Sequence, residues 1–251
     1  EKERQNFVYG NEAEGVPGCI VNGIEEKVAN KIYDDMIDFA KYAFNKSHAA
    51  ACAVVAYQTA WLRCYHPVEF MAALISSVKE NAGKVSFYIQ ACRTMGIQIL
   101  PPDINKSEGD FSVDKDAIRY GLSAVKSVGS AVTDCIRQEV LTNGPFTSLT
   151  DYVNRLSNKE ANKRTIESFI CAGAFDSFGY NRKQLMLVYS RVLDQANQEK
   201  KSAMTGQMSL LDFLGAEEKT EFEVQYPDVE EYSKEEKLAK EKEMLGISVS
   251  G

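Results

Sequence analysis

The sequence predicts a mainly α-helical protein, on three observations. Apolar residues recur at three- and four-residue spacing over residues 24–44, which is the period of an amphipathic helix. Residues 120–140 and 162–175 each combine helical runs with a glycine corner. Extended patterns are confined to short runs within residues 97–120. We therefore expect helices throughout, with a minor short β-hairpin.

The chain has 251 residues, enough for one large domain or two to three small ones, and 44% of them are hydrophobic. No apolar run approaches the ~18 residues of a membrane span. The N-terminal sequence EKERQNFVYG lacks the pattern of a secretory signal, and we expect it to come from the middle of a protein. Six cysteines without a CxxC pair indicate buried reduced thiols, ahead of a metal site or disulfides.

The net charge of −7 argues against a nucleic-acid partner, but its distribution weakens that argument. Residues 199–251 hold 13 acidic and 7 basic side chains, whereas residues 114–182 hold 8 acidic and 9 basic ones. The acidity is concentrated in the tail, and the middle of the chain can still present a basic edge.

The first quarter of the chain is expected to form two helices after an irregular start. Residues 1–23 contain several glycines and a proline, and we expect no regular structure there. A helix over residues 24–44 is interrupted by a polar loop at residues 45–48. The next helix, residues 49–65, is apolar around most of its girth, which predicts that it is buried.

Two further helices and a hairpin follow. Pro67 suits the first position of a helix, and a second helix over residues 85–95 stops at a glycine. Residues 111–113 and 117–120 are expected to be short strands on either side of residues 114–116, which read Asp-Lys-Asp. Alternating carboxylates can hold a metal, but between two strands a solvated turn is the better interpretation.

The first glycine corner spans residues 120–132, YGLSAVKSVGSAV. An apolar turn leads to Lys126 and Ser127, and a helix follows, with Gly129 expected to supply a positive φ and Ser130 to be the N-cap. The free amides of a helix start attract anions, and Lys126 lies beside them. The corner is therefore either a grip on a nucleic-acid phosphate or an ordinary structural turn.

The second corner repeats the order of helix, glycine hairpin and helix. Asn162 is the expected N-cap of a helix over residues 163–171, and the hairpin that follows contains Gly173. A structural pair of corners with surface bases is again the alternative. The candidate phosphate-binding residues here are Asn162, Lys163, Arg164, Gly173 and Arg182.

The tail changes in composition after a long amphipathic helix over residues 182–200. Residues 202–232 are polar and acidic, which predicts a mobile linker. An apolar island at residues 207–213 has no core to join, so it either meets a partner or folds back onto the helices. A charged helix is expected over residues 233–245, followed by an extended segment.

Several motifs, in one order along the chain, resemble a single protein family, the alpha subunits of bacterial DNA polymerase III, which are C-family replicative polymerases. The resemblance covers nearly the whole chain, and MLGISVSG at residues 244–251 is similar to the entry of that family's nucleic-acid-binding barrel. The motifs are FNKSHAAACAVVAYQTAWLRCY (44–65), HPVEFMAALISS (66–77), LPPDIN (100–105), YGLSAVKSVG (120–129), GPFTSL (144–149), NKRTIESFICAGAFDSFG (162–179) and GQMSL (206–210).

The resemblance implies four parts. Residues 1–104 resemble the C-terminal part of the polymerase fingers, and residues 105–200 a tandem helix-hairpin-helix module that binds DNA. Residues 201–232 then resemble a flexible linker with a clamp-binding motif, and residues 233–251 a helix leading into a following domain. The family's palm motif, whose carboxylates hold Mg²⁺, has no match here, so we expect no catalysis by this stretch alone.

The resemblance also implies sites and partners. The fingers position nucleotide and template, the helix-hairpin-helix pair grips duplex primer–template DNA without reading its sequence, and the linker docks on the ring-shaped sliding clamp. Other replisome subunits, no membrane and a location in the bacterial cytoplasm are expected. The alternative is a non-catalytic module for docking within the replisome. The nucleotide- or template-proximal residues are Asn45, Lys46, Ser47 and His48, and the clamp-binding residues are Gln207, Met208, Ser209, Leu210, Leu211 and Phe213.

Two positions depart from the family pattern. The family usually has an aromatic residue where Cys52 stands, which removes one packing contact. It often has glycine where Ser127 stands. A side chain at that position either hinders close approach of the backbone to a phosphate or supplies a replacement hydrogen bond through its hydroxyl.

Overall fold

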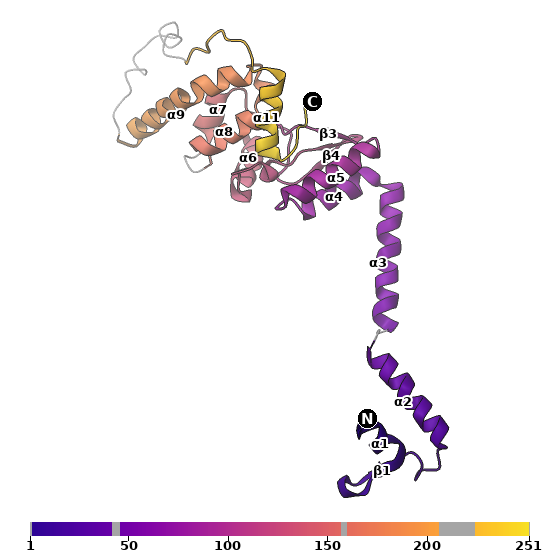
Figure 1. Cartoon of the computed structure of the whole chain (residues 1–251). Helices are drawn as coiled ribbons and strands as arrows, with labels where there is room; N and C mark the ends of the chain where they lie inside the picture. Colours follow the sequence, from indigo (N-terminus) through magenta and orange to yellow (C-terminus); the bar gives the residue numbers. More distant parts are fainter. Residues whose placement is uncertain (1, 42–45, 157–159, 206–223, 251) are drawn as a thin grey trace. The chain divides into compact units, whose positions relative to one another are not determined.

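The chain is mainly α-helical in a computed structural model that describes residues 2–41, 46–156, 160–205 and 224–250, which confirms the predicted class (Figure 1). It divides into two compact units, Glu1–Trp61 and Leu62–Gly251. Each unit is described by itself below.

The first unit is a small helical pair with a short hairpin. The predicted irregular start is wrong, because α1 packs on α2 and buries Val8 and Ala29 between them. Contacts between the two helices, including the Phe7 and Tyr33 rings with centroids 5.5 Å apart, stabilise a helix too short to form alone. The elements are α1 (Lys2–Tyr9), β1 (Gly10–Asn11), η1 (Glu12–Glu14), β2 (Val16–Pro17, antiparallel to β1), α2 (Glu26–Lys41) and the first part of α3 (Lys46–Tyr65).

Helix α3 differs from its prediction in two ways. It begins at Lys46, so Lys46, Ser47 and His48 of the expected polar loop instead form its first turn, while Asn45 lies outside the described residues. None of its residues is buried, and Tyr57 and Val55 are 71% and 58% exposed. An apolar helix is buried only where other elements cover it, and the described chain provides no such cover. The prediction of burial is therefore wrong for this chain.

The second unit starts with two helices and a three-stranded sheet. Helix α4 (Pro67–Ser77) has its proline at the first turn, as predicted. Helix α5 (Ala82–Thr94) begins three residues before the predicted start, because the side chain of Asn81 accepts a hydrogen bond from the amide of Lys84. The sheet has the order β3 (Gln98–Leu100), β5 (Ala117–Arg119), β4 (Ser112–Asp114); β3 runs parallel to β5 and β4 antiparallel, the latter pair being the predicted hairpin.

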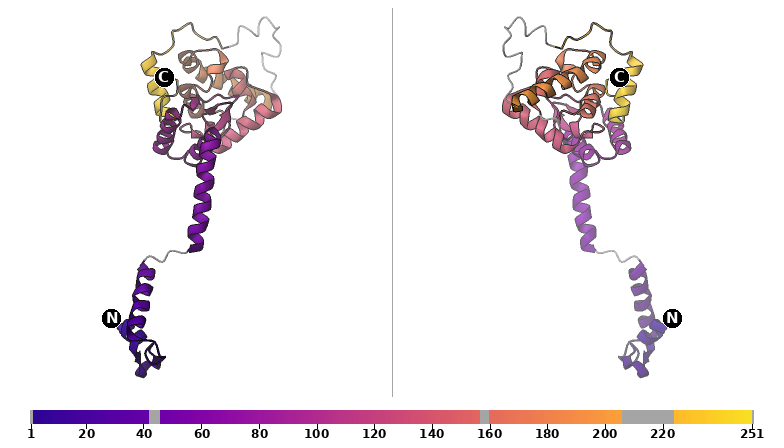
Figure 2. Two further views of the ribbon diagram at one scale, coloured as in Figure 1. Left: turned by 90° about the vertical axis from the view of Figure 1, so that its right-hand side faces the viewer. Right: turned by 90° about the vertical axis from the view of Figure 1, so that its left-hand side faces the viewer.

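The remaining elements are helical, and α7, α8, α9 and α11 pack against one another. Helix α7 lies against α9, and α11 and α9 both lie against α8 (Figures 1 and 2, α11 in yellow). The elements are η2 (Leu122–Ala124), α6 (Ser130–Asn143), α7 (Leu149–Arg155), α8 (Lys163–Ala172), η3 (Asp176–Phe178), α9 (Arg182–Thr205) and α11 (Lys234–Leu245).

One hydrophobic core joins the sheet region to these helices. A chain of aromatic rings runs through it: Phe146 contacts Tyr152, and Tyr152 contacts Phe175, with centroids 5.2 and 5.1 Å apart. The segment between β3 and β4 is hydrogen-bonded to the helical part of the unit at two points. Asn105 exchanges hydrogen bonds with the backbone of Phe146, and the amide of Ile104 donates to the carbonyl of Ala174 at 2.9 Å.

A buried ionic group holds the second corner. Arg182 is only 1% exposed, and its guanidinium donates to Glu241 at 2.8 Å and to Asp176 at 2.7 Å. Gly173 makes room for it, since a Cβ there would lie 2.2 Å from Nη2 of Arg182. Gly173 also has a φ of +82°, a left-handed conformation that favours glycine. The group thereby joins α8, α9 and α11.

The predicted linker differs from the structure at both of its ends. Helix α9 continues to Thr205, and residues 206–223 lie outside the described part of the chain. The segment over residues 224–232 packs onto the start of α9: Gln184 donates to the carbonyl of Pro227 at 2.9 Å, and Glu231 accepts from the amides of Arg182 and Lys183. A carboxylate at a helix start satisfies its unpaired amides and interacts favourably with the dipole.

All six cysteines are free thiols, as expected, but only Cys92 and Cys171 are buried. Burial raises the pKa of Cys92 to about 11. Cys19 is half-buried, and the expectation of burial is wrong for the other three, since Cys52 and Cys64 lie on the uncovered α3 and Cys135 on the exposed face of α6. None of the described helices has both the length and the apolar character needed to cross a membrane.

Replacing Glu241 tests the buried group. Burial opposes ionisation of Glu241, but hydrogen bonds from Ser250, Arg182 and the amide of Val249 outweigh it and lower its pKa below the ordinary 4.5. We expect Glu241→Gln to reduce the free energy of unfolding by about 3 kcal/mol at neutral pH, because it breaks a buried ion pair. Urea denaturation measures this difference.

The pH dependence follows from the direction of the shift. A carboxylate with a lowered folded-state pKa stabilises the fold above its unfolded pKa. The difference in free energy of unfolding between wild type and Glu241→Gln should therefore disappear as the pH falls through the lowered pKa. The exposed Glu243 on the same helix provides the control, and Glu243→Gln should change stability by less than about 1 kcal/mol. Equal effects of the two substitutions would contradict the assignment.

Candidate nucleic-acid interface

The first corner places two exposed polar residues between two buried valines. Strand β5 leads through η2 into residues 126–129 and then into α6. Val125 and Val128 are buried, whereas Lys126 and Ser127 between them are exposed. The alternation directs the two polar side chains outward while the valines anchor the turn in the core.

The special backbone position of this corner is Ser127. Its φ is +69°, whereas Gly129 has a φ of −90° and is itself the N-cap of α6, with Ser130 as the first helical residue. The predicted positive φ at Gly129 and the predicted N-cap at Ser130 are therefore wrong, because the chain reverses two residues earlier. A left-handed φ explains why glycine suits the position of Ser127 in the family that the sequence resembles.

The start of α6 presents unused backbone donors. The amides of Val132 and Thr133 both donate to the carbonyl of Gly129, which closes the first turn. Within the described chain, the amides of Ser130 and Ala131 have no acceptor. Exposed amides at a helix start form an anion site together with the helix dipole.

The second corner has the predicted cap. The side chain of Asn162 accepts a hydrogen bond from the amide of Thr165 at 3.0 Å, which confirms it as the N-cap of α8. Lys163 and Arg164 follow in the first turn and are exposed. The Lys163 ammonium lies 6.0 Å from the centre of the Tyr189 ring, so it remains on the α8–α9 surface.

The two corners meet through their side chains. Nε of Arg164 donates to Oγ of Ser127 at 3.0 Å, across 37 residues of sequence. The contact borders a cavity of about 360 Å³ between the first corner, α8 and α11. The residues that line this cavity are Lys126, Ser127, Arg164, Glu167, Ser168, Cys171, Met186, Glu243 and Met244.

Helix α11 completes this surface. The amide of Lys126 donates to the carbonyl of Met244 at 2.9 Å, and its ammonium lies 3.6 Å from the carboxylate of Glu243. Both side chains of the ion pair are more than half exposed. Inspection of the sequence missed Glu243, because it is one of several acids on a charged helix and only the tertiary contact distinguishes it.

Gly173 and Arg182 lie apart from the exposed group. The amide of Gly173 donates to the carbonyl of Ile170, and Arg182 is occupied by Asp176 and Glu241 in the core. Their part in the second corner is structural, and neither presents a group to a ligand at the exposed surface.

The remaining candidate residues belong to other parts of the chain. Lys46, Ser47 and His48 form the first turn of α3, with Nε2 of His48 3.4 Å from Sγ of Cys52. Asn45 lies outside the described residues. The predicted clamp-binding residues also lie outside them: Gln207, Met208, Ser209, Leu210, Leu211 and Phe213.

The alternating carboxylates at residues 114–116 form the predicted turn. Lys115 has a φ of +58°, and Asp114 pairs with Arg119 at 2.6 Å. The hydrogen bond from Arg119 lowers the pKa of Asp114, which keeps it ionised for the ion pair. Within the described part of the chain, no group of three or more His, Cys, Asp or Glu side chains has a metal-binding arrangement.

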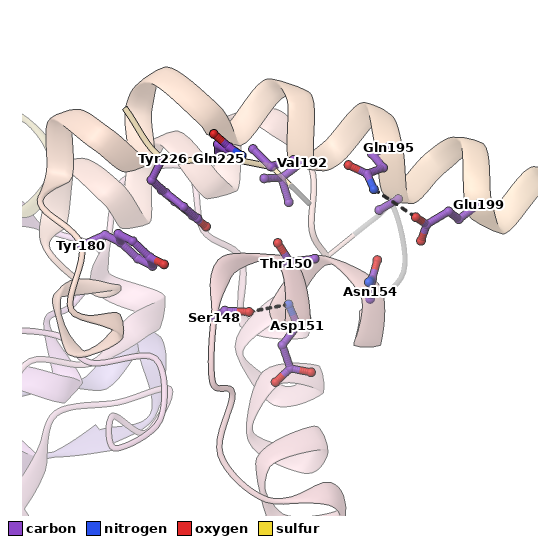
Figure 3. Close-up of a pocket in the computed structure, with 12 residues that line it drawn as sticks. Ser148, Thr150, Asp151, Asn154, Tyr180, Val192, Gln195, Glu199, Gln225 and Tyr226 are labelled. Atoms are coloured by element: carbon purple, nitrogen blue, oxygen red, sulfur yellow. Dashed lines mark hydrogen bonds between the residues drawn. The ribbon is translucent and has the colours of Figure 1, made fainter. Parts of the chain in front are cut away.

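A larger cavity, of about 760 Å³, lies away from the corners between α7, α9 and residues 224–226 (Figure 3). The rings of Tyr180 and Tyr226 stack at one end with centroids 3.7 Å apart. Glu199 contributes a carboxylate to its lining, whereas the carboxylate of Asp151 points away from the cavity and pairs with Arg155 at 3.2 Å. Acidic side chains repel phosphate, so this cavity is a poor candidate for the nucleic-acid interface.

The paired corners define the class of the central part: residues 96–185 match a family model described as a helix-hairpin-helix motif. Over its whole length the chain is homologous to part of DNA polymerase III subunit alpha. It is 40% identical over 255 residues to the protein of Mycobacterium tuberculosis (strain H37Rv), 39% over 251 to that of Deinococcus radiodurans and 40% over 254 to that of Thermus aquaticus. The chain spans 21%, 18% and 19% of these relatives, about a fifth of their length.

The strained position in the first corner gives a stability test. Ser127→Gly and Ser127→Ala both remove the hydroxyl that accepts from Arg164, so their difference isolates the backbone. At a φ of +69° we expect the glycine variant to be more stable than the alanine variant by about 1 kcal/mol.

The same pair of substitutions at Ser130 is the control. Ser130 is helical, so alanine should equal or exceed glycine there. Chemical denaturation of the four variants measures both differences. If the alanine variant were at least as stable as the glycine variant at both positions, Ser127 would carry no backbone strain.

Proposed function

We propose that the chain is part of a replicative DNA polymerase and that its central module holds duplex DNA by the phosphate backbone. The proposal rests on the contact between Arg164 and Ser127, which gathers the polar groups of both corners at one surface. The similarity to DNA polymerase III alpha subunits over the whole chain supports the identity of the parent protein.

The groups at this surface suit phosphate. Lys126, Lys163 and Arg164 supply positive charge, and the amides of Ser130 and Ala131 supply backbone donors. Gly129 has open space on its Cα, so a phosphate can approach the backbone closely there. Such contacts position a protein on DNA without reading bases, and binding should therefore tolerate any sequence. Further polar groups on this surface come from Ser127 and Asn162.

In the parent enzyme, the N-terminal part would contribute to the polymerase fingers. Asn45, Lys46, Ser47 and His48 are proposed to lie near the nucleotide or template, where the start of α3 and the Lys46 ammonium favour an anionic phosphate. Catalysis would depend on Mg²⁺ held by palm carboxylates that have no match in this chain. The cytoplasm and the replisome are the expected setting.

The salt dependence of DNA binding tests the central module. For the full 251-residue chain, the logarithm of the association constant with a labelled duplex should fall linearly with the logarithm of salt concentration, with a slope of about −0.9 per phosphate contact. Lys163→Gln/Arg164→Gln should reduce the magnitude of the slope by about 0.9 for each phosphate that the variant no longer neutralises. Fluorescence anisotropy over a salt series measures both.

The matched control removes two exposed bases outside the corners, Lys84→Gln/Arg191→Gln, and should leave the slope unchanged. Equal slopes for wild type and the Lys163/Arg164 variant would exclude these side chains as phosphate ligands. Clamp binding without any duplex affinity at low salt would instead favour a docking module.

The clamp-binding proposal rests on the motif alone, and a titration tests it. Gln207 can hydrogen-bond at one pocket of a clamp while Met208, Leu210 and Leu211 fill apolar ones. Leu210→Ala/Leu211→Ala should weaken binding of purified sliding clamp by at least about tenfold, because two buried leucine side chains are truncated. Equal binding of clamp by wild type and the double variant would remove the motif from the interface.

A further inference from the structure

Helix α11 is held on both sides of Glu243, to the first corner after it and to Arg182 before it. The hydroxyl of Tyr120 donates to the carbonyl of Leu245 at 2.8 Å, and the amide of Lys126 donates to that of Met244 at 2.9 Å. Two residues before Glu243, the carboxylate of Glu241 is fully buried against Arg182. The backbone of Glu243 is therefore held in place, and only its side chain is free to rotate.

This attachment brings a carboxylate to the proposed phosphate site. Glu243 lies 3.6 Å from the ammonium of Lys126 and lines the cavity that Arg164 also borders. The other acid in that lining, Glu167, accepts a hydrogen bond from the hydroxyl of Tyr189, which directs it toward α9. Glu243 is thus the acid that occupies the position beside Lys126 where a DNA phosphate would bind.

We propose that Glu243 is a built-in competitor of the DNA phosphate at Lys126 and weakens the grip of the first corner on DNA. The inference rests on the proposed DNA binding of this module and adds a residue that regulates it. The carboxylate substitutes for a phosphate oxygen when DNA is absent, and the phosphate must displace it from the ammonium when DNA arrives.

The exposure of the pair makes the competition reversible. Glu243 and Lys126 have side chains 62% and 56% exposed, and ion pairs in that setting contribute little to stability. A phosphate can therefore replace the carboxylate at the Lys126 ammonium, but the anchored helix keeps the displaced carboxylate nearby.

The experiment compares duplex affinity of the full chain and three single variants by fluorescence anisotropy at low salt. Glu243→Gln should bind about fivefold more tightly than wild type, because the phosphate no longer displaces a unit charge that attracts the Lys126 ammonium across about 4 Å in water. Glu235→Gln makes the same charge change at an exposed position in the first turn of the same helix and should leave affinity within about twofold of wild type. Lys126→Gln should weaken binding.

The double variant Lys126→Gln/Glu243→Gln separates direct competition from general charge repulsion. With Lys126 absent, the gain from Glu243→Gln should fall below about twofold, since the two side chains act on one phosphate. Equal affinity of Glu243→Gln and wild type, or equal gains from Glu243→Gln and Glu235→Gln, would overturn the inference.

The outcome also distinguishes this inference from the proposed function. Salt-dependent binding by wild type with no effect of Glu243→Gln would overturn the competitor and leave the DNA grip intact. Absence of binding by wild type and by Glu243→Gln would overturn both. Binding that appears only in Glu243→Gln would support the competitor strongly.

Discussion

The buried guanidinium of Arg182 is the interaction on which the second unit depends. It joins Asp176 after the second hairpin to Glu241 on α11, and its volume explains why position 173 has no side chain. A charge removed from water must be paired to be tolerated, so α9, which carries Arg182, cannot separate from the two elements that supply its partners without a large cost. The network thereby fixes α11, at the end of the long acidic tail, against the paired corners.

The positions of the exposed groups in both corners follow from this attachment. Because α11 is held at Glu241, its last turn reaches the first corner and bonds the amide of Lys126. Because α8 is held at the same network, Arg164 in its first turn reaches Ser127. The exposed cations and helix-start amides are thus positioned by a buried arginine that itself faces no ligand, and the acidic Glu243 is carried to the same place.

The sequence predicted features that depend on local spacing. The period of α2, the proline of α4 and the Asn162 cap were all recognisable, since each depends on residues within one or two turns. The predictions failed where residues distant in the sequence determine the structure. Arg182 was grouped with surface bases because its two acidic partners come from separate elements, and Gly129 was given the positive φ that Ser127 adopts, since which residue turns depends on how the corner packs.

The central claim is that both corners hold one stretch of DNA backbone. Amide chemical-shift mapping by NMR, with unlabelled duplex titrated into the isotope-labelled chain, tests it most directly. The amides of residues 126–131 and 162–165 should shift together with one common dissociation constant, while those around Tyr180 and Tyr226 stay unchanged. Shifts confined to one corner, two different constants, or a response centred on another surface would contradict the account.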